Sequence, residues 1–131
     1  MQYNKNRHAA YLLHAHIVFV TKYRRKVLSD IHHDAFVVAA NRVCGEAGVT
    51  LEECNGEADH VHLRVNYPPS VQLTKLINSL KAVTSRRLRQ QFADLTGAYH
   101  KPVLWSRAYF VSSCGGAPLE MVKEYIKNQQ G

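Results

Sequence analysis

The order of apolar and polar positions along this chain predicts four strands. A run rich in β-branched and aromatic residues predicts the first strand within residues 11–23. Residues 49–55 and 60–67 predict a second and a third strand, which a short acidic turn joins into an antiparallel pair. Residues 104–111 predict a fourth strand that ends before a diglycine. Polar and apolar residues alternate in the third strand, so we expect one buried and one polar face there.

Apolar residues at helical spacing predict three helices. The first follows Ser29 or Asp30 as its N-cap and ends near two glycines. The second and longest begins after a diproline, with Ser70 as its N-cap. A last helix covers about residues 118–130, where a proline suits the first turn.

The resulting order, β-α-β-β-α-β with a terminal helix, is that of the ferredoxin-like split β-α-β sandwich. We therefore expect an α+β fold, in which helices cover one face of a four-stranded antiparallel sheet. The polar face of the third strand would stay free on the other side. Nothing in the 131 residues looks like a second core or a long linker, so we expect one domain over residues 1–131.

Composition places the chain among ordinary globular proteins, with 46% hydrophobic and 21% charged residues. The longest apolar stretches are far too short to span a bilayer, and the polar N-terminus lacks the features of a signal peptide. We expect a cytoplasmic protein without membrane contact. The three cysteines lack Cys-x-x-Cys spacing, which argues against a disulfide framework and against a zinc knuckle.

The charge balance points to a nucleic-acid partner. The chain has 17 Lys and Arg residues against 10 Asp and Glu residues, a formal net charge of +7. Basic residues cluster after the first strand and on the long helix, where an ordinary solvated face explains them equally well. Tyr23, set among them, is suited to stacking on an unpaired base. The candidate DNA-binding residues are Lys22, Tyr23, Arg24, Arg25, Lys26, Arg64, Lys81, Arg86 and Arg87.

The segment His60-Val61-His62 opens the third strand. Because strand side chains alternate, both imidazoles point the same way, with Cα atoms roughly 6.8 Å apart. Such a pair can share one metal ion and leave much of its coordination sphere open, although two hydrogen-bonded histidines would fit the spacing too. A second pair, His14 and His16, has the same spacing but an alanine at its centre, which favours a structural or substrate-contact role.

Tyr125 and Gln129 lie four residues apart on the predicted last helix. Residues at this spacing share a helix face, so the two side chains could address one target. Ordinary packing of the helix explains the spacing at least as well.

Four segments carry a resemblance to a known family: Thr21 to Leu28, Asp59 to Leu63, Leu104 to Val111 and Tyr125 to Gln129. Together they resemble the HUH family, named for two histidines that flank a bulky apolar residue. Within it they are most similar to the single-tyrosine, IS200-like transposases of small bacterial insertion sequences.

The resemblance implies a metal-assisted transposase that acts on single-stranded DNA. In that family the histidine pair and a helix glutamine hold a divalent ion while the tyrosine attacks a DNA phosphate. These roles fall on His60, His62, Gln129 and Tyr125. We expect Mg²⁺, with Mn²⁺ as a substitute, because imidazole and amide ligands suit these ions and a structural zinc site would need four closing ligands. A 5′-phosphotyrosine conserves bond energy, so strand transfer rather than hydrolysis is the expected outcome.

The resemblance also implies partners. Relatives recognise single-stranded DNA hairpins at the ends of the element. The family forms a homodimer whose final helix crosses to the partner, so that each active site joins one chain's histidines to the other chain's tyrosine. Gly115-Gly116 would suit a movable attachment for such a helix, although a diglycine is more often a simple turn.

Two other functions stay open on the sequence alone. A non-catalytic ferredoxin-like nucleic-acid-binding module would explain the charge and the fold. The third strand argues against it, because RNA-recognition domains place stacking aromatics there and this strand offers His60, His62 and Arg64. A metal-dependent phosphodiesterase that uses water would not need Tyr125.

Overall fold

The computed structural model describes residues 4–5, 10–11, 13–113 and 119–129 of the chain. A small hairpin pairs β1 (Asn4–Lys5) with β2 (Ala10–Tyr11). The remaining elements are β3 (His14–Val20), η1 (Lys22–Arg24), α1 (Asp30–Glu46), β4 (Thr50–Glu57), β5 (His60–Asn66), α2 (Leu73–Gln91), α3 (Ala93–Gly97), β6 (Phe110–Ser113) and α4 (Leu119–Asn128). Within these described ranges, none of the helices has the length and apolar character needed to cross a membrane.

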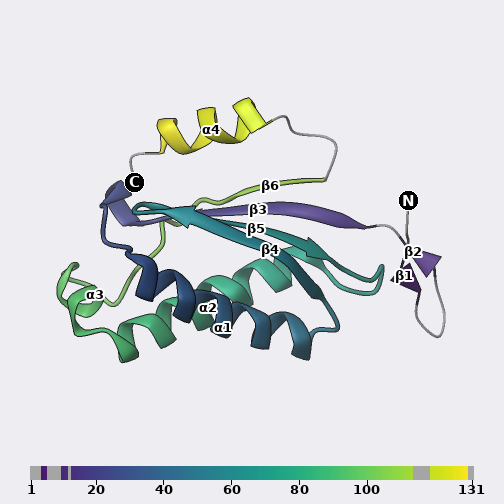
Figure 1. Ribbon diagram of the computed structural model, residues 1–131, viewed down its shortest axis with the longest axis horizontal. Coiled ribbons are helices and arrows are strands. Elements are labelled where there is room, and N and C mark those ends of the chain that lie inside the picture. Colours follow the sequence, from purple (N-terminus) through teal and green to yellow (C-terminus); the bar gives the residue numbers. More distant parts are fainter. Residues whose placement is uncertain (1–3, 6–9, 12, 114–118, 130–131) are drawn as a thin grey trace.

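One antiparallel sheet of four strands, in the order β4-β5-β3-β6, organises the fold. α1 and α2 pack side by side against one face of this sheet, and α4 lies over the other face (Figure 1). The order of elements and the central place of β3 and β5 confirm the predicted ferredoxin-like α+β fold. The small hairpin before β3 was not predicted.

Alternate residues of the two central strands build the core against α1 and α2. Ile17 and Phe19 of β3 and Val61 and Leu63 of β5 are fully buried there. Because strand side chains alternate between faces, the residues between them point toward the α4 side. Trp105 joins this core, with its ring centroid 5.8 Å from that of Phe19.

α1 begins and ends as its sequence predicts. Ser29 occupies the N-cap position, and its backbone N–H donates to Nδ1 of His32 at 2.9 Å. This bond satisfies one of the donors that a helix start leaves unpaired. After the helix, Gly48 adopts a φ of 72°, a left-handed conformation that glycine accepts without steric cost.

The predicted fourth strand over residues 104–111 is wrong in position. β6 begins only at Phe110. The preceding segment forms only an isolated antiparallel bridge, between Trp105 and Thr21, and the indole N–H of buried Trp105 donates to Oγ1 of Thr84 in α2 at 3.0 Å. This tertiary contact outweighs the local preference of the segment for a strand.

One expectation for the long helix is also wrong, and one short helix after it was missed. α2 has Gln72, not Ser70, at its N-cap position. Ser70 lies in a turn that the bond from the Val71 N–H to the Pro68 carbonyl closes at 3.0 Å. After Phe92 the chain forms the short helix α3, which the sequence pattern did not predict.

α4 covers the sheet face that was expected to stay free (Figure 1). A small apolar cluster joins Val18 and Val20 of β3 to Phe110 of β6 and to Tyr125 and Ile126 of α4. The polar side of β5 therefore lies in a layer between the sheet and α4. Segment 114–118, with the diglycine, lies outside the described residues.

Replacing Leu63 with alanine should lower the free energy of unfolding by about 2–5 kcal/mol, because it leaves a cavity beneath the centre of the sheet. Urea denaturation followed by circular dichroism measures the change. Val38→Ala, at a position 72% exposed on α1, is the control and should change it by less than about 0.5 kcal/mol. Equal losses in the two variants would contradict the core described above.

Candidate active site

His60 and His62 occupy alternate positions of β5, with half-buried side chains on the face that α4 covers. Val61, between them, is fully buried on the opposite face. On the neighbouring strand, Val20 lies opposite His60 and Val18 lies opposite His62. The two imidazoles therefore leave the strand on the same side, as the alternation predicts.

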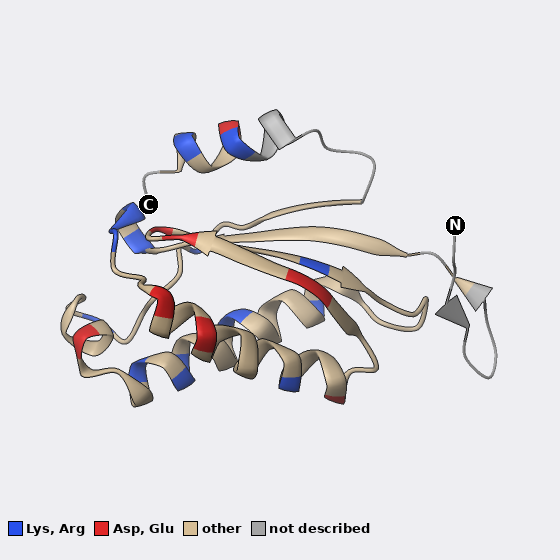
Figure 2. Cartoon of the chain, viewed as in Figure 1, with Lys and Arg blue, Asp and Glu red and all other residues tan. Residues whose placement is uncertain are grey.

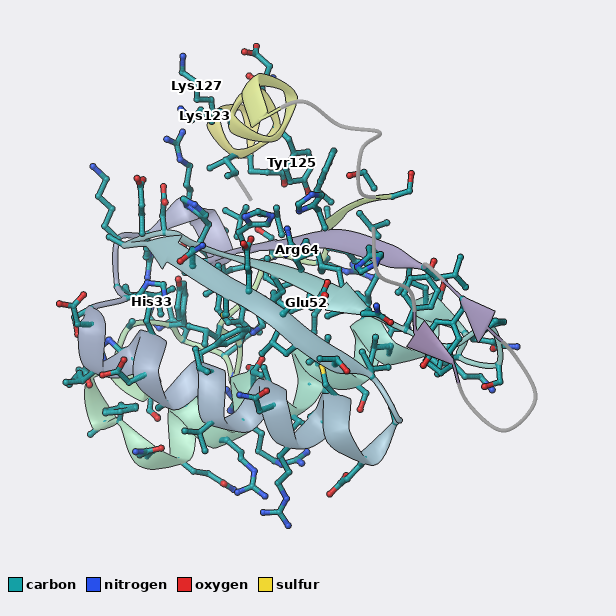
Figure 3. All side chains as sticks on the ribbon, turned by 45° about the vertical axis from the view of Figure 1, so that its right-hand side comes forward. His33, Glu52, Arg64, Lys123, Tyr125 and Lys127 are labelled. Carbon is teal, nitrogen blue, oxygen red and sulfur yellow. The ribbon has the colours of Figure 1, made fainter. Side chains whose placement is uncertain are left out.

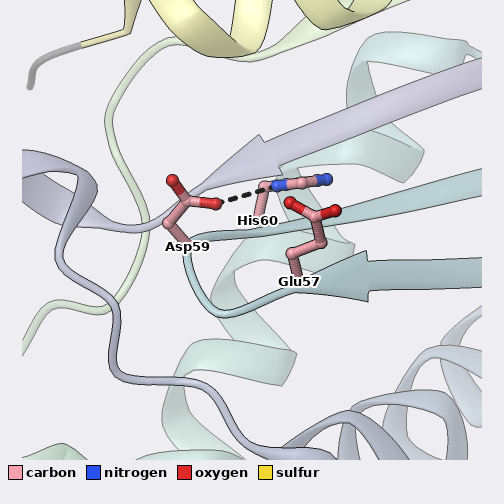
Figure 4. Close-up of side chains that lie close together, drawn as sticks. All are labelled: Glu57, Asp59 and His60. Atoms are coloured by element: carbon pink, nitrogen blue, oxygen red, sulfur yellow. Dashed lines mark hydrogen bonds and ion pairs between the residues drawn. The ribbon is translucent and has the colours of Figure 1, made fainter.

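The imidazole of His60 is held by the residue before it. Nδ1–H of His60 donates to Oδ1 of Asp59 at 2.9 Å (Figure 4). Nε–H of Arg24 donates to Oδ2 of the same carboxylate at 2.9 Å. Burial would raise the pKa of Asp59, but the hydrogen bonds from His60 and Arg24 outweigh it and hold that pKa below its usual range. With the proton on Nδ1, His60 keeps a lone pair on Nε2 for a ligand.

His62 contacts a histidine of the neighbouring strand. Its Nε2 lies 2.9 Å from Nδ1 of His16, and the two rings stack with centroids 5.0 Å apart. Burial, and then the charge of His16, lower the pKa of His62. The imidazole therefore stays neutral at neutral pH, the form that a metal ligand requires.

Glu57, Asp59 and His60 form a group of described side chains that could hold a metal ion, since one ligand atom of each lies within 4.8 Å of the others (Figure 4). Both Asp59 oxygens already accept hydrogen bonds, whereas the Glu57 side chain is exposed beside the His60 ring. A carboxylate and a neutral imidazole nitrogen are suitable donors for a divalent ion, so the residues fit one. Sequence reasoning missed Glu57 and Asp59, which it took only for an acidic turn.

Tyr125 projects from α4 toward the sheet, while Lys123 and Lys127 of the same helix point away from it (Figure 3). Its ring centroid lies 5.1 Å from that of Phe110. The hydroxyl is buried, and no described residue forms a hydrogen bond with it. Burial raises the pKa of Tyr125, so the phenol is neutral at neutral pH.

Gln129 follows the end of α4 and is half-buried. Its backbone N–H donates to the Ile126 carbonyl at 3.2 Å, but within the described residues its side-chain amide forms no hydrogen bond with either histidine of β5. The end of α4 is instead connected to the Asp59–His60 pair through Arg24. Nη1–H of Arg24, the partner of Asp59, donates to the Lys127 carbonyl at 3.0 Å.

The second histidine pair divides between two roles. His16 lies beside His62, whereas Nδ1–H of His14 donates to Oε1 of Glu52 at 2.7 Å. Arg64, a candidate DNA-binding residue, places its Nε 3.4 Å from the same Glu52 oxygen (Figure 3). Glu52 therefore contacts both His14 and Arg64 on the sheet surface, away from the His60 ring.

Lys and Arg residues gather in the segment after β3 and along α2 (Figure 2). Tyr23, Arg25 and Lys26 are exposed, while Arg24 is engaged with Asp59. On α2 the candidates separate, because Lys81 and Arg86 line one cavity whereas Arg87 lines another. The predicted basic residues thus lie on more than one side of the molecule.

A family model described as "Transposase IS200 like" matches residues 9–129. The chain belongs to the IS200-like transposase family. The match spans both the histidine strand and the tyrosine helix, and it confirms the family resemblance of the sequence.

Curated relatives of this IS200-like transposase cover most of its length. It is 32% identical over 114 residues to the transposase for insertion sequence element IS200 of Salmonella typhimurium, covering 87% of this chain and 74% of the relative. It is 22% identical over 129 residues to the ISDra2 transposase TnpA of Deinococcus radiodurans, covering 98% of this chain and 92% of the relative.

Two solved structures share its fold. The crystal structure of a Deinococcus radiodurans protein assigned as a transposase has a TM-score of 0.88 at 26% identity, over 98% of both chains. A REP-associated tyrosine transposase bound to a REP hairpin has a TM-score of 0.58 at 9% identity, over 94% of this chain and 68% of that one. The second likeness shows the fold alone.

In this member of the family, Tyr125→Phe should leave the free energy of unfolding unchanged or raise it by up to about 1 kcal/mol, because it removes a buried hydroxyl that has no hydrogen-bond partner among the described residues. Tyr99→Phe is the matched control. Its hydroxyl donates to the Lys22 carbonyl at 2.9 Å, so its loss should cost about 0.5–1.5 kcal/mol. Chemical denaturation of both variants makes the comparison, and equal losses would mean that the Tyr125 hydroxyl has a partner.

Proposed function

We propose that this transposase cleaves and rejoins single-stranded DNA at the ends of an insertion sequence, through a 5′-phosphotyrosine at Tyr125. The observation that carries the proposal is a convergence of groups on one sheet face. A histidine whose Nδ1 is held by Asp59, a neutral histidine and a tyrosine all lie in the layer between β5 and α4. These groups could supply metal ligands and a nucleophile, which DNA cleavage by a transposase of this kind requires.

We propose that His60, His62 and Gln129 hold the divalent ion, Mg²⁺ or Mn²⁺. Support comes from the proton that Asp59 keeps on Nδ1 of His60 and from the lowered pKa of His62. The nearby Glu57 carboxylate adds a further oxygen donor. When bound, the ion neutralises charge on the non-bridging phosphate oxygens and orients the phosphorus for attack.

Tyr125 supplies the nucleophile in this proposal. Its oxygen forms a bond to phosphorus, the bond from phosphorus to the 3′ oxygen breaks, and the phenol proton is lost while the leaving oxygen gains one. The reverse attack by another DNA 3′-hydroxyl then expels the phenolate and rejoins the strand. Because the Tyr125 side chain packs in a cluster with Val18, Val20 and Phe110 and its hydroxyl is buried, α4 has to shift before DNA reaches the hydroxyl.

We further propose a homodimer in which α4 serves the partner chain. In the structure α4 lies over its own sheet, where one guanidinium bond from Arg24 and a small apolar cluster hold it. These few contacts suit a helix that changes its position. In the dimer, His60 and His62 of one chain would act with the tyrosine of the other.

Incubation with a pool of single-stranded DNA hairpins and Mg²⁺ or Mn²⁺ should give a covalent protein–DNA adduct on a denaturing gel. Tyr125→Phe should abolish the adduct, and a chelator should prevent its formation in the unmodified chain. Tyr109→Phe, which removes a hydroxyl outside this layer, is the control and should retain it. Cleavage that survives in Tyr125→Phe would instead identify water as the nucleophile and a phosphodiesterase.

Two variants that are each inactive should regain adduct formation when mixed, if each active site combines residues of both chains. Mixing a size-tagged His60→Ala chain with Tyr125→Phe creates dimers in which one site has both intact residues. The adduct should then form on the tagged His60→Ala chain. Absence of the adduct in the mixture, with activity in the unmodified chain, would show that the tyrosine serves its own chain.

A further inference from the structure

A cavity of about 490 Å³ opens on the far side of the segment that carries Arg24. Its volume falls within the range of about 300–1,000 Å³ that small-ligand pockets occupy. We call it the Tyr23 cavity. The residues that matter here are Lys22, Tyr23, Arg25, Tyr99, Lys101 and Arg107. Two of them are aromatic and four carry positive charge.

The two tyrosine rings of this cavity lie close together and share one neighbouring cation. The ring centroids of Tyr23 and Tyr99 lie 6.4 Å apart, and the guanidinium of Arg25 lies 5.3 Å from the first and 5.0 Å from the second. Tyr23 is 58% exposed, which is unusual for a large aromatic ring. An exposed ring next to cations is the arrangement that stacks on unpaired bases.

The backbone that presents Tyr23 is strained. Tyr23 and Arg24 have φ angles of 60° and 54°, in the left-handed region that bulky residues rarely adopt. Thr21 stabilises this turn, since its hydroxyl donates to the Arg25 carbonyl at 2.6 Å. Such strain persists where the surroundings hold it, and it concentrates at functional sites. Here the turn exposes Tyr23 while it directs Arg24 to Asp59.

Positive charge continues from the Tyr23 cavity along α2. A neighbouring cavity of about 480 Å³ shares Val103 and Trp105 with it and is lined by Lys81, Arg86 and Arg89. Among the described residues, no Asp or Glu lines either cavity. The two cavities therefore form one positively charged surface, which attracts a phosphate backbone.

We propose that the Tyr23 cavity receives one unpaired base of single-stranded DNA, stacked on Tyr23. The phosphates next to that base contact Lys22, Lys101 and Arg107, and the strand continues toward Lys81 and Arg86. This inference rests on the proposed function for its substrate class. It adds a base-binding site, separate from the layer between β5 and α4, and assigns roles to Lys101 and Arg107, which sequence reasoning did not select.

Stacking is tested by removing the Tyr23 ring, the DNA bases, or both, and comparing the affinities. The probes are a fluorescent dT 12-mer and an abasic 12-mer with the same phosphates, bound in the presence of a chelator and measured by anisotropy. Tyr23→Asn keeps a residue that tolerates left-handed φ but removes the ring. It should weaken binding of the dT 12-mer by about 5- to 150-fold and leave the abasic 12-mer unchanged. Tyr23→Phe should bind both like the unmodified chain.

Charge variants test the phosphate path. Arg107→Ala should weaken both oligomers and reduce the slope of log affinity against log salt by about 0.7. Arg87→Ala, in the cavity that Arg42 also lines, is the charge-matched control and should change the slope less. The proposal is overturned if Tyr23→Asn weakens both oligomers equally or neither. Because the chelator prevents cleavage, this outcome is independent of the adduct assay.

Discussion

The alternation of side chains along β5 is the constraint on which the rest of the site depends. Val61 and Leu63 are fully buried between the sheet and its two helices, and they leave no freedom for His60 and His62 to face the core. Strands on both sides fix the register of β5. A slip by one residue would expose the valine and leucine and bury the imidazoles, at a cost of several kcal/mol of lost burial. Hydrophobic burial thus sets the direction of the polar groups.

The orientation of the polar residues of β5 depends on the guanidinium of Arg24. Arg24 donates both to Asp59, which holds His60, and to the carbonyl of Lys127 at the end of α4. Asp59 is 6% exposed and would be costly to bury without these partners. The orientation of the His60 ring and the position of the tyrosine helix are therefore coupled through a single side chain. The strained turn around Tyr23 is what brings Arg24 to this place.

Much of the fold could be predicted from the sequence, because alternation along a strand and helical spacing of apolar residues both show which side chains are buried. The late start of β6 at Phe110 could not, because Trp105 before it forms a hydrogen bond with Thr84 of a distant helix. The direction of the two histidines followed from alternation. The support from Asp59 and Arg24 did not, because it joins residues 35 positions apart. Helical spacing placed Tyr125 on one face of α4 without indicating that its hydroxyl would be buried with no hydrogen-bond partner in the part of the chain that the structure describes.

The central place of β3 also governs when the molecule can assemble. β3 lies near the start of the chain, yet its partners β5 and β6 follow about 46 and 95 residues later. During synthesis, Ile17 to Val20 must therefore wait for most of the chain to emerge before their sheet neighbours arrive. The cluster of Val18 and Val20 under α4 closes last. A nascent chain thus acquires its hydrophobic core before it acquires the layer that holds the tyrosine.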